Sequence, residues 1–468
     1  MKHDYDCVIV GGGPAGMAAA IAMKRLGVAD VLLLDRNPRL GGILNQCIHP
    51  GFGLSRYDRD LTGPEYARAL ESEFAASGVE CLLGAMVLEI SESRMLKVIA
   101  PSEGFAEISA RSVIVATGCR ERTRENLEIA GSRPTGVFTA GQAQNLINLK
   151  GYRLGQRVII QGSGDIGLIM ARRLTIEGYQ VVGVFERLPY LSGLVRNKVQ
   201  CLDHFDIPLR FGTQISEIVG KGRVEGVFAE KMDDEQRPIA GIREFFPCDT
   251  VLFSVGLIPE VDILKSAGLV PHPGRPIAVN SRFETGAAGI FMCGNALHIH
   301  DLADNAAKEG ESVAHHVAQY LRSREEYAAF VTQSKPYRPL PVNARFNASF
   351  FAALEESGQK VCIVCPKGCA VSAKAAPCPR GAAYFAESEK GRYQTMTTTT
   401  GAIQEGSRTR LPIKSLETVE VGNLALKKKA IALAAEERLP RSPRGSPSSE
   451  AQFSVKVAGM DVRFSICD

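Results

Sequence analysis

Residues 7–35 have the sequence CVIVGGGPAGMAAAIAMKRLGVADVLLLD, and this stretch decides the fold. An apolar run at 7–10 is followed by the glycine-rich segment 11–16, by an alanine-rich segment and by a second apolar run that ends at Asp35. Strand, glycine turn, helix, strand and terminal acid are the parts of a βαβ unit that binds a dinucleotide. We therefore expect a Rossmann-like fold here.

Each part of this unit has a physical role. The first glycine makes the tight turn, the second lets the backbone approach a pyrophosphate, and the third lets the helix pack closely on the strand. The helix N-terminus then attracts the phosphates, and the acid bonds a ribose hydroxyl. The alternative, an ordinary glycine-rich turn, does not account for the complete set. The candidate dinucleotide-binding residues are Gly11, Gly13, Pro14, Ala15, Gly16, Asp35 and Arg36.

The pattern is repeated about 150 residues later. A strand at 157–161 leads into a second glycine motif at 162–167, and the next strand ends at Glu186. An acid at this place favours NAD because it bonds the 2′-hydroxyl and repels the 2′-phosphate of NADP. Arg187 beside it could soften that preference, and a vestigial fold without a dinucleotide is the alternative. The candidate residues are Gly162, Gly164, Asp165, Ile166, Gly167, Glu186 and Arg187.

Composition supports a globular α/β enzyme. The 468 residues are 45% apolar and 23% charged, with 46 glycines and a net charge of +4. This charge gives no reason to expect a nucleic acid or a membrane surface as partner. We find no apolar stretch of the roughly 18 residues that span a bilayer and no signal-peptide pattern at the first residues, so we expect a cytoplasmic protein without a transmembrane segment.

The periodicity between the two glycine motifs predicts further elements. Residues 61–76 are typical of a helix capped by Thr62, with Pro64 in its first turn. Residues 81–90, 94–100 and 106–110 are predicted to be three strands of a β-meander. Two apolar strands, 113–116 and 251–255, end in Gly118 and Gly256 and are expected to deliver these glycines to a cofactor.

Two more motifs carry a family resemblance. Residues 113–118 have the sequence VIVATG and residues 285–295 the sequence TGAAGIFMCGN. With the glycine motifs, they make residues 5–325 resemble the two-dinucleotide-domain flavoproteins of the pyridine nucleotide-disulfide oxidoreductase family. The resemblance implies FAD in the first fold and a nicotinamide cofactor in the second. Asn295 stands where the family usually has Asp, and it keeps the hydrogen-bonding capacity while losing the charge. Further candidate cofactor contacts are Gly42, Val87, Thr117, Gly118, Gly256, Gly294 and Asn295.

A narrower resemblance is carried by four segments: LGGILNQCIHPGFGL at 40–54, GSRPTGVFTAGQAQ at 131–144, GSGDIGLIMARR at 162–173 and CGNALHIHDL at 293–302. They resemble the flavoprotein subunits associated with anaerobic glycerol-3-phosphate dehydrogenases and, more distantly, subunits of opine oxidases and hydrogen cyanide synthases. This implies a redox subunit that works with a partner dehydrogenase.

The candidate catalytic residues are Cys47 and His49. Disulfide reductases of the family have two cysteines four residues apart after the corresponding glycine pair, but this chain has one, so we do not expect internal dithiol chemistry. Cys47 resembles the flavin-proximal cysteine and is either a thiolate near the flavin or a packed side chain. His49 is a candidate proton donor, with a packing role as the alternative. The run 298–301 (HIHD) has metal-ligand spacing, but we expect it to line the flavin because it follows the second FAD motif directly.

The chain changes character after residue 325. We expect a linker at 326–355 and a cysteine-rich module at 356–468, with a low-complexity stretch at 437–450. The module resembles a small uncharacterised domain encoded beside or fused to such flavoproteins. A compact cysteine cluster is more readily metal-binding than disulfide-bonded in a reducing compartment, so we expect an iron–sulfur cluster, with zinc or unligated thiols as alternatives. Its candidate ligands are Cys362, Cys365, Cys369 and Cys378.

Together these patterns predict an α/β protein with two doubly wound Rossmann-like domains and a small C-terminal module. Residues 1–120 and 256–325 form the FAD-binding domain and 121–255 the NAD(P)-binding domain. The leading hypothesis is an FAD-dependent oxidoreductase that moves electrons between NAD(H), favoured over NADP(H), and an acceptor or partner protein. The alternatives are the flavoprotein subunit of a heteromeric glycerol-3-phosphate, opine or amino-acid dehydrogenase, and an electron-carrier or assembly protein that uses the fold as a scaffold.

Overall fold

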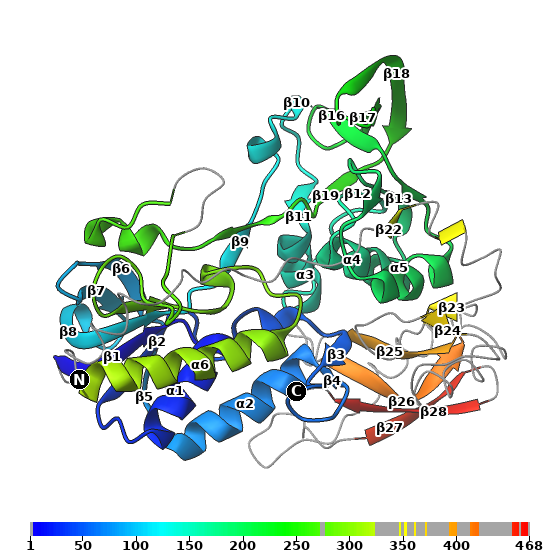
Figure 1. Ribbon diagram of the computed structural model, residues 1–468. Helices are drawn as coiled ribbons and strands as arrows, with labels where there is room; N and C mark the ends of the chain where they lie inside the picture. The colour runs from blue at the N-terminus through cyan, green and yellow to red at the C-terminus, as the bar shows by residue number, and fades with distance from the viewer. Residues whose placement is uncertain are drawn as a thin grey trace. The chain divides into compact units, whose positions relative to one another are not determined.

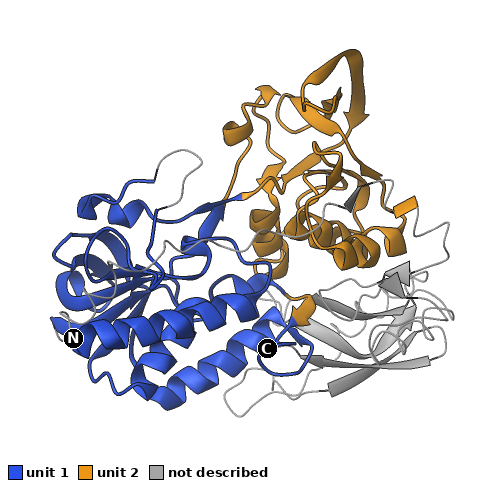
Figure 2. Ribbon diagram, viewed as in Figure 1, with its two compact units in different colours: residues 1–47, 52–120, 257–342 blue, residues 48–51, 121–256, 343–468 orange. Residues whose placement is uncertain are grey.

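The computed structural model describes residues 3–271 and 277–322. Beyond residue 322 it describes the course of short segments only, which are 346–347, 351–352, 360–361, 370–371, 393–399, 412–420, 452–457 and 460–466. The chain divides into two compact units (Figure 2). Unit 1 comprises residues 1–47, 52–120 and 257–342, and unit 2 comprises residues 48–51, 121–256 and 343–468.

Unit 1 is built on a seven-stranded sheet with the order β5-β2-β1-β8-β7-β6, in which β21 also pairs with β8. Five strands are mutually parallel, and β6, β7 and the first part of β8 form an antiparallel meander. The parallel part is a doubly wound Rossmann-like sheet, as predicted. The strands are β1 (Asp4–Val10), β2 (Val31–Asp35), β5 (Glu80–Leu83), β6 (Met86–Ile90), β7 (Met95–Ala100), β8 (Gly104–Val115) and β21 (Ile290–Met292).

Two strand predictions in this unit are wrong. Residues 81–90 form two strands rather than one, because the chain turns at Gly84 and Ala85. The first half, β5, extends the parallel sheet beside β2, and the second half, β6, begins the meander. Residues 106–110 and 113–116 were predicted as separate strands, but both lie on β8, which serves the meander with one half and the parallel sheet with the other.

Three helices pack in unit 1, with α1 lying between α2 and α6 (Figure 1). Helix α2 starts at Gly63, and its N-cap Thr62 forms a capping box with Glu65, which satisfies two amide groups of the first turn. The core of the unit is formed by the sheet's apolar side chains and the facing sides of these helices. The helices are α1 (Pro14–Arg25), α2 (Gly63–Ser77) and α6 (Ala303–Arg322).

Unit 2 repeats the design with a five-stranded parallel sheet of order β11-β19-β12-β13-β15. In both sheets the strand after the glycine motif's helix lies next to the strand before it, as in a Rossmann fold. The strands are β11 (Val137–Thr139), β12 (Arg157–Gln161), β13 (Gln180–Phe185), β15 (Leu209–Arg210) and β19 (Thr250–Phe253). The helices are α3 (Ala140–Asn148), α4 (Asp165–Ile176) and α5 (Val195–Cys201).

A second sheet in unit 2 has the order β10-β16-β17-β18, with strands β10 (Ala130–Gly131), β16 (Thr213–Val219), β17 (Gly226–Met232) and β18 (Pro238–Pro247).

Short strands occur in both units. They are β3 (Pro50–Phe52), β4 (Leu61–Thr62), β9 (Cys119–Glu121), β14 (Tyr190–Leu191), β20 (Leu257–Pro259) and β22 (Phe346–Asn347).

Toward the C-terminus the structure describes strands β23 (Lys360–Val361), β24 (Ala370–Val371), β25 (Tyr393–Thr399), β26 (Pro412–Glu420), β27 (Gln452–Val457) and β28 (Met460–Ile466). The last four form one antiparallel sheet of order β25-β26-β28-β27. The last two strands, β27 and β28, are neighbours in this sheet. None of the helices in the described ranges combines the length and the apolar character needed to cross a bilayer.

Candidate functional site

The first glycine loop connects β1 to α1 in unit 1. Gly11 adopts φ 113°, which favours glycine, and a side chain there would collide with the Ala116 carbonyl at the end of β8. Gly13 is the N-cap of α1, and Pro14 occupies the first turn, where its missing N–H costs nothing. A Cβ added to Gly13 would meet no atom within 4 Å. The loop therefore leaves open space directly at the helix N-terminus, where a pyrophosphate would lie.

Asp35 ends β2 beside this loop and is 7% exposed. Its Oδ2 accepts a hydrogen bond from the Gly12 N–H at 2.6 Å, and its Oδ1 accepts two from Asn37 at 2.7 and 2.9 Å. A carboxylate oxygen offers about two acceptor positions, so Oδ2 has room for a further donor. Asp35 is thus fixed by the loop and can still accept from a ribose hydroxyl.

The ends of β8 and β21 bring the other predicted FAD contacts into the same unit. Thr117 donates to the Glu260 carbonyl at 2.5 Å. Asn295 accepts from the His300 N–H at 3.0 Å and donates to the Cys119 sulfur at 3.7 Å, which leaves its second amide hydrogen for a ligand. Gly294 donates to Glu309 at 2.6 Å.

The other three candidate contacts lie elsewhere in unit 1. Val87 is buried in β6, and Arg36 is exposed after β2. Gly42 begins a 3₁₀ turn at 42–46 whose backbone lies near Gly13.

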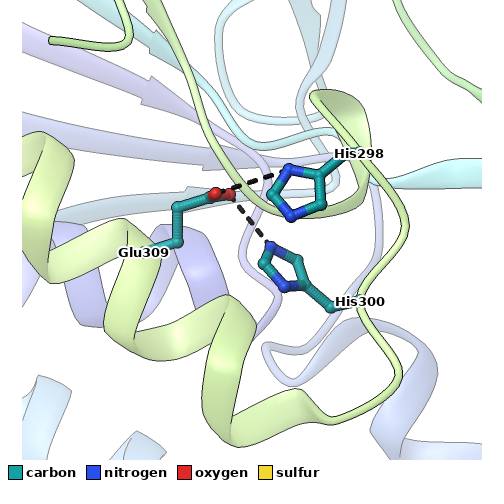
Figure 3. Close-up of side chains that lie close together, drawn as sticks. All are labelled: His298, His300 and Glu309. Carbon is teal, nitrogen blue, oxygen red and sulfur yellow. Dashed lines mark hydrogen bonds and ion pairs between the residues drawn. The ribbon is translucent and has the colours of Figure 1, made fainter. Parts of the chain in front are cut away.

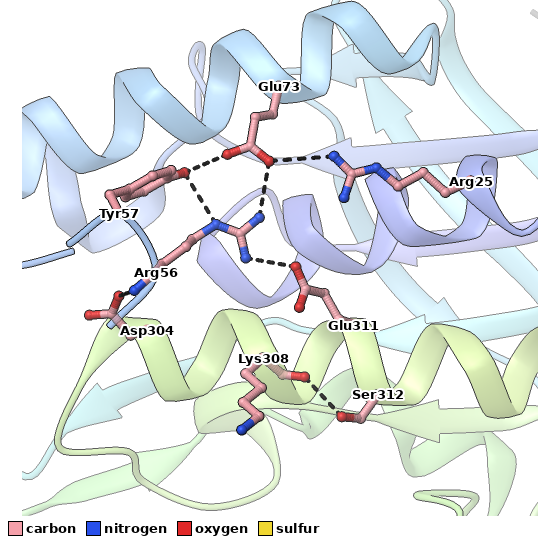
Figure 4. Close-up of polar contacts among 8 residues, drawn as sticks. All are labelled: Arg25, Arg56, Tyr57, Glu73, Asp304, Lys308, Glu311 and Ser312. Carbon is pink, nitrogen blue, oxygen red and sulfur yellow. Dashed lines mark hydrogen bonds and ion pairs between the residues drawn. The ribbon is translucent and has the colours of Figure 1, made fainter. Parts of the chain in front are cut away.

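A polar cluster ties the loop at 53–60 to the helices of unit 1 (Figure 4). The Arg56 guanidinium donates to Glu311 on α6 at 2.6 Å and to Glu73 on α2 at 3.1 Å, and Tyr57 donates to Glu73 at 2.8 Å. Asp304, in the first turn of α6, accepts from the backbone N–H groups of Gly53 and Arg56 at 3.2 and 2.9 Å. The cluster therefore fixes this loop against the start of α6. Sequence reasoning did not identify these residues.

The second glycine loop lies between β12 and α4 in unit 2, as predicted. Glu186 at the end of β13 is 4% exposed, and protein donors surround its carboxylate. Oε2 accepts from the Ser163 N–H at 2.8 Å, the Ser163 hydroxyl at 2.5 Å and the Ser192 hydroxyl at 2.9 Å, while Oε1 accepts from the Leu188 N–H at 3.0 Å. Arg187 is exposed and donates to the Gln236 carbonyl at 3.0 Å.

Residues 192–197 lie on this second glycine loop, a feature that sequence reasoning missed. Gly193 donates to the Ser163 carbonyl at 2.9 Å, and Asp165 accepts from the Leu194 N–H and the Asn197 side chain at 2.8 Å each. A side chain on Gly193 would come within 2.9 Å of Asp165 N and Ser163 O. Compared with the open space at Gly13, the N-terminus of α4 is therefore more closely covered by its own chain.

Cys47 and His49 fall into different units. Cys47, in unit 1, is partly buried against the start of α2, where its carbonyl accepts from the Gly63 N–H at 2.8 Å. His49 is partly buried and belongs to unit 2. Burial lowers the pKa of His49 to about 4, and the positive charges of Arg196 and Arg172 act in the same direction. The ring is therefore neutral near pH 7, so any proton that it transfers at this pH comes from or goes to a neutral imidazole.

Three other predicted residues, Gly256, Ile166 and Gly167, lie in unit 2. Gly256 follows β19 with φ 105°, and its carbonyl accepts from the Arg122 N–H at 2.9 Å. Ile166 and Gly167 lie in the first turn of α4, where Gly167 donates to the Ser254 hydroxyl at 3.0 Å. The four candidate metal ligands, Cys362, Cys365, Cys369 and Cys378, lie outside the described residues.

A family model described as pyridine nucleotide-disulphide oxidoreductase matches residues 5–310. The chain belongs to this family. The open loop at Gly13, with the acceptor Asp35 beside it, fits the dinucleotide that an oxidoreductase of this family binds.

Two curated relatives are named as enzyme subunits. Hydrogen cyanide synthase subunit HcnB of Pseudomonas aeruginosa is 30% identical over 282 residues, which cover 56% of this chain and 59% of that protein. An opine oxidase subunit from Agrobacterium tumefaciens is 24% identical over 326 residues, which cover 63% and 62%. The chain thus spans less than two thirds of the length of these relatives.

Among solved structures, thioredoxin reductase of T. acidophilum superposes with a TM-score of 0.56 at 25% identity, and the match covers 69% of this chain and 100% of that chain. This agreement confirms the predicted Rossmann-like fold of the family. The relatives also confirm the predicted resemblance to opine oxidase and hydrogen cyanide synthase subunits.

Proposed function

We propose that this protein moves electrons between a nicotinamide cofactor and an acceptor or partner protein through FAD bound in unit 1. The observation that carries the proposal is the space at Gly13, because an added Cβ meets no protein atom there, whereas one added at Gly11, Gly12 or Gly16 would collide with neighbouring atoms. Bound FAD would supply the redox chemistry, as cofactors generally do. The protein would contribute binding, orientation and electrostatics.

The residues of unit 1 have distinct roles in this proposal. The N-terminal amides of α1 bind the pyrophosphate, and Pro14 holds the first turn in a helical conformation without blocking them. Asp35 accepts from the adenosine ribose through Oδ2. Asn295 donates its second amide hydrogen to the ribityl chain, and it is held in position by the His300 N–H.

We propose that unit 2 takes NAD(H) in preference to NADP(H). Glu186 is buried and held by Ser163, so a 2′-phosphate would meet a fixed negative charge. Arg187 is directed to the Gln236 carbonyl rather than to Glu186, which argues against its neutralising that charge. Because only one cysteine follows the glycine pair, we propose that Cys47 acts as a single thiol rather than as half of a dithiol. His49 stays a candidate proton donor, and at pH 7 it would act as a neutral imidazole.

Anaerobic mixing with NADH or NADPH tests this function. We expect NADH to bleach the flavin absorbance after mixing. NADPH should bleach it at a lower rate. Cys47→Ser should retain both the flavin and its reduction by NADH. Protein that carries flavin but is not reduced by either nucleotide would contradict the proposal, and protein that binds no flavin would favour the scaffold alternative.

A second candidate function has specific support in the relatives, which are named as enzyme subunits. In this alternative, the chain is the flavoprotein subunit of a heteromeric dehydrogenase for glycerol-3-phosphate, an opine or an amino acid, and the substrate is oxidised on another subunit. Purification from the native cell should then recover a second polypeptide in fixed ratio. Flavin bleaching by that substrate should require the second polypeptide.

We also propose that the clustered cysteines bind a metal and relay electrons between the flavin and a one-electron acceptor. Their support is the sequence spacing C-x2-C-x3-C-x8-C, which can place four thiolates around one centre. Anaerobic purification followed by iron, sulfide and zinc analysis tests the relay. Acid-labile sulfide with iron supports it; zinc alone contradicts the relay but supports a structural site; no metal contradicts both.

A further inference from the structure

Three side chains point toward one another in unit 1, and two of them belong to the run 298–301 (Figure 3). His298 and His300 lie on the turn that follows the 3₁₀ helix at Gly294–Ala296, and Glu309 projects from α6. His300 Nε2 is 3.0 Å from Glu309 Oε2, and His298 Nδ1 is 3.5 Å from Glu309 Oε1. One donor atom from each residue lies within 4.8 Å of the others. We call these three residues the His–Glu cluster.

Hydrogen bonds fix the backbone on both sides of the cluster. Glu309 accepts from the Gly294 N–H at 2.6 Å, so its carboxylate is held against the turn. The His300 N–H donates to Asn295 Oδ1 at 3.0 Å, and the His298 N–H donates to the Gly294 carbonyl at 3.2 Å. The three side chains therefore converge without needing a ligand to collect them, which is the preorganisation that a binding site requires.

Burial separates the cluster from ordinary surface groups. The side chain of Glu309 is 6% exposed, that of His300 10% and that of His298 20%. Burying a carboxylate is costly unless it is paired with a cation or with hydrogen-bond donors. Glu309 is buried and faces two imidazoles, an arrangement in which a bound cation would offset that cost.

The donor set selects the kind of cation. Two imidazole nitrogens and one carboxylate suit Zn²⁺ or Fe²⁺, whereas Mg²⁺ and Ca²⁺ prefer oxygen ligands alone. In a tetrahedral site with bonds of about 2.0–2.1 Å, neighbouring ligand atoms lie about 3.3 Å apart. The two His–Glu separations, 3.0 and 3.5 Å, lie on either side of this value. The three donor atoms lie within 4.8 Å of one another, so their side chains must draw closer to share one ion.

From this geometry we propose that the His–Glu cluster binds a divalent transition-metal cation. Three protein ligands leave at least one coordination position open, as in catalytic rather than structural sites. The run 298–301 was predicted to line the flavin, and that stays a prediction. The proposed ion site lies beside the Gly294–Asn295 turn, where Glu309 contacts both the Gly294 N–H and the His300 ring. The proposal does not depend on which dinucleotide binds in either unit.

Zinc uptake by the full chain tests the site. The purified protein is stripped with a chelator, equilibrated with Zn²⁺ and dialysed, and the bound zinc is counted by elemental analysis. The clustered cysteines could also take up zinc, so the same count is made in a full chain in which Cys362, Cys365, Cys369 and Cys378 are replaced by serine. We expect this serine-substituted chain to retain about one Zn²⁺ per chain.

Substitutions then locate the ion. His298→Gln and His300→Gln should each lower the zinc content by about one ion per chain relative to their parent, in both backgrounds. His315→Gln is the matched control, because His315 is an exposed histidine on α6 outside the cluster, and it should leave the count unchanged. The proposal is overturned if the serine-substituted chain binds no zinc, or if the His298 and His300 variants bind as much as their parent.

Discussion

The hydroxyl of Ser192 donates a hydrogen bond to the carboxylate of Glu186 at 2.9 Å. The accepting oxygen, Oε2, also receives the N–H and the hydroxyl of Ser163. Because a carboxylate oxygen offers about two acceptor positions, Oε2 has none to spare. A ribose hydroxyl must therefore use the remaining position on Oε1 or displace Ser192. The acid that we propose to select the nucleotide is thus partly occupied by its own chain.

Removing this competitor should strengthen nucleotide binding. We expect Ser192→Ala to lower the Kd for NADH by roughly threefold, since one hydrogen bond of about 0.5–1.5 kcal/mol no longer has to be exchanged. Ser216→Ala is the control, because its hydroxyl bonds the Phe228 carbonyl in another sheet of the same unit. Equilibrium titration of the two variants is the measurement. Weaker NADH binding by Ser192→Ala would show that Ser192 itself contacts the nucleotide.

Gly13 offers a clean test of the flavin site. Its backbone has φ −77°, which any residue can adopt, and an added Cβ meets no protein atom within 4 Å. Gly13→Val should therefore fold normally but lose bound flavin, because the side chain would fill the space of the pyrophosphate. Flavin absorbance per chain and circular dichroism are the readouts. Gly222→Val, at an exposed glycine with equally open surroundings, should keep the flavin. A yellow Gly13→Val protein would refute the placement.

Local sequence was sufficient to predict the two βαβ units because strand, turn, helix and acid are adjacent in each. It was insufficient at 81–90, where the apolar pattern continues through Gly84 and Ala85. Period-two alternation indicates a strand but not its partner, so the sequence could not show that β5 pairs with β2 and β6 with β7. The partner is chosen by the tertiary fold.

The same reason limits the prediction of sites. Asp35 and Glu186 were found because each ends a strand at a fixed distance from a glycine motif. Ser192 was missed because its contact with Glu186 depends on how residues 192–197 fold back, and no motif marks that return. Glu309 was missed for a similar reason. It lies in the middle of α6, and only the tertiary fold brings its carboxylate to His298 and His300.

His49 should make the protein sensitive to acid. Burial lowers its pKa to about 4, below the ordinary value of 6.5, so the unfolded chain binds a proton that the folded chain rejects. Stability from this residue is therefore complete above about pH 6.5 and is lost as the pH falls toward 4, by about 2 kcal/mol between pH 7 and pH 5.

Urea unfolding at pH 7 and pH 5 measures this effect. His49→Gln should show a smaller loss of unfolding free energy between the two pH values than the wild type. His315→Gln, at an exposed histidine of α6, is the control and should behave as the wild type does. If His49→Gln loses as much stability on acidification as the wild type, other groups control the acid response.

Arg56 should stabilise unit 1 more than its neighbour Arg25, although both approach Glu73. The Arg56 side chain is 15% exposed and lies 3.1 Å from Glu73 and 2.6 Å from Glu311, whereas the Arg25 side chain is 66% exposed and lies 3.7 Å from Glu73. Replacing this partly buried cation removes its hydrogen bonds to Glu73 and Glu311, so Arg56→Met should lower the unfolding free energy by roughly 1–3 kcal/mol. Arg25→Met, an exposed pair, should change it by less than about 0.5 kcal/mol.

Comparing Arg56→Met with Arg25→Met distinguishes the contribution of the Arg56 contacts from that of an exposed surface charge. Because the Arg56 side chain also ties the loop at 53–60 to α2 and α6, limited proteolysis should cut this loop faster in Arg56→Met than in the wild type. In Arg25→Met the rate of cleavage should not change. Added salt should reduce the small loss of unfolding free energy in Arg25→Met. It should leave most of the loss in Arg56→Met, since buried ion pairs are screened less than exposed ones. Equal loss of stability in both variants would mean that the Arg56 contacts add nothing beyond an exposed ion pair.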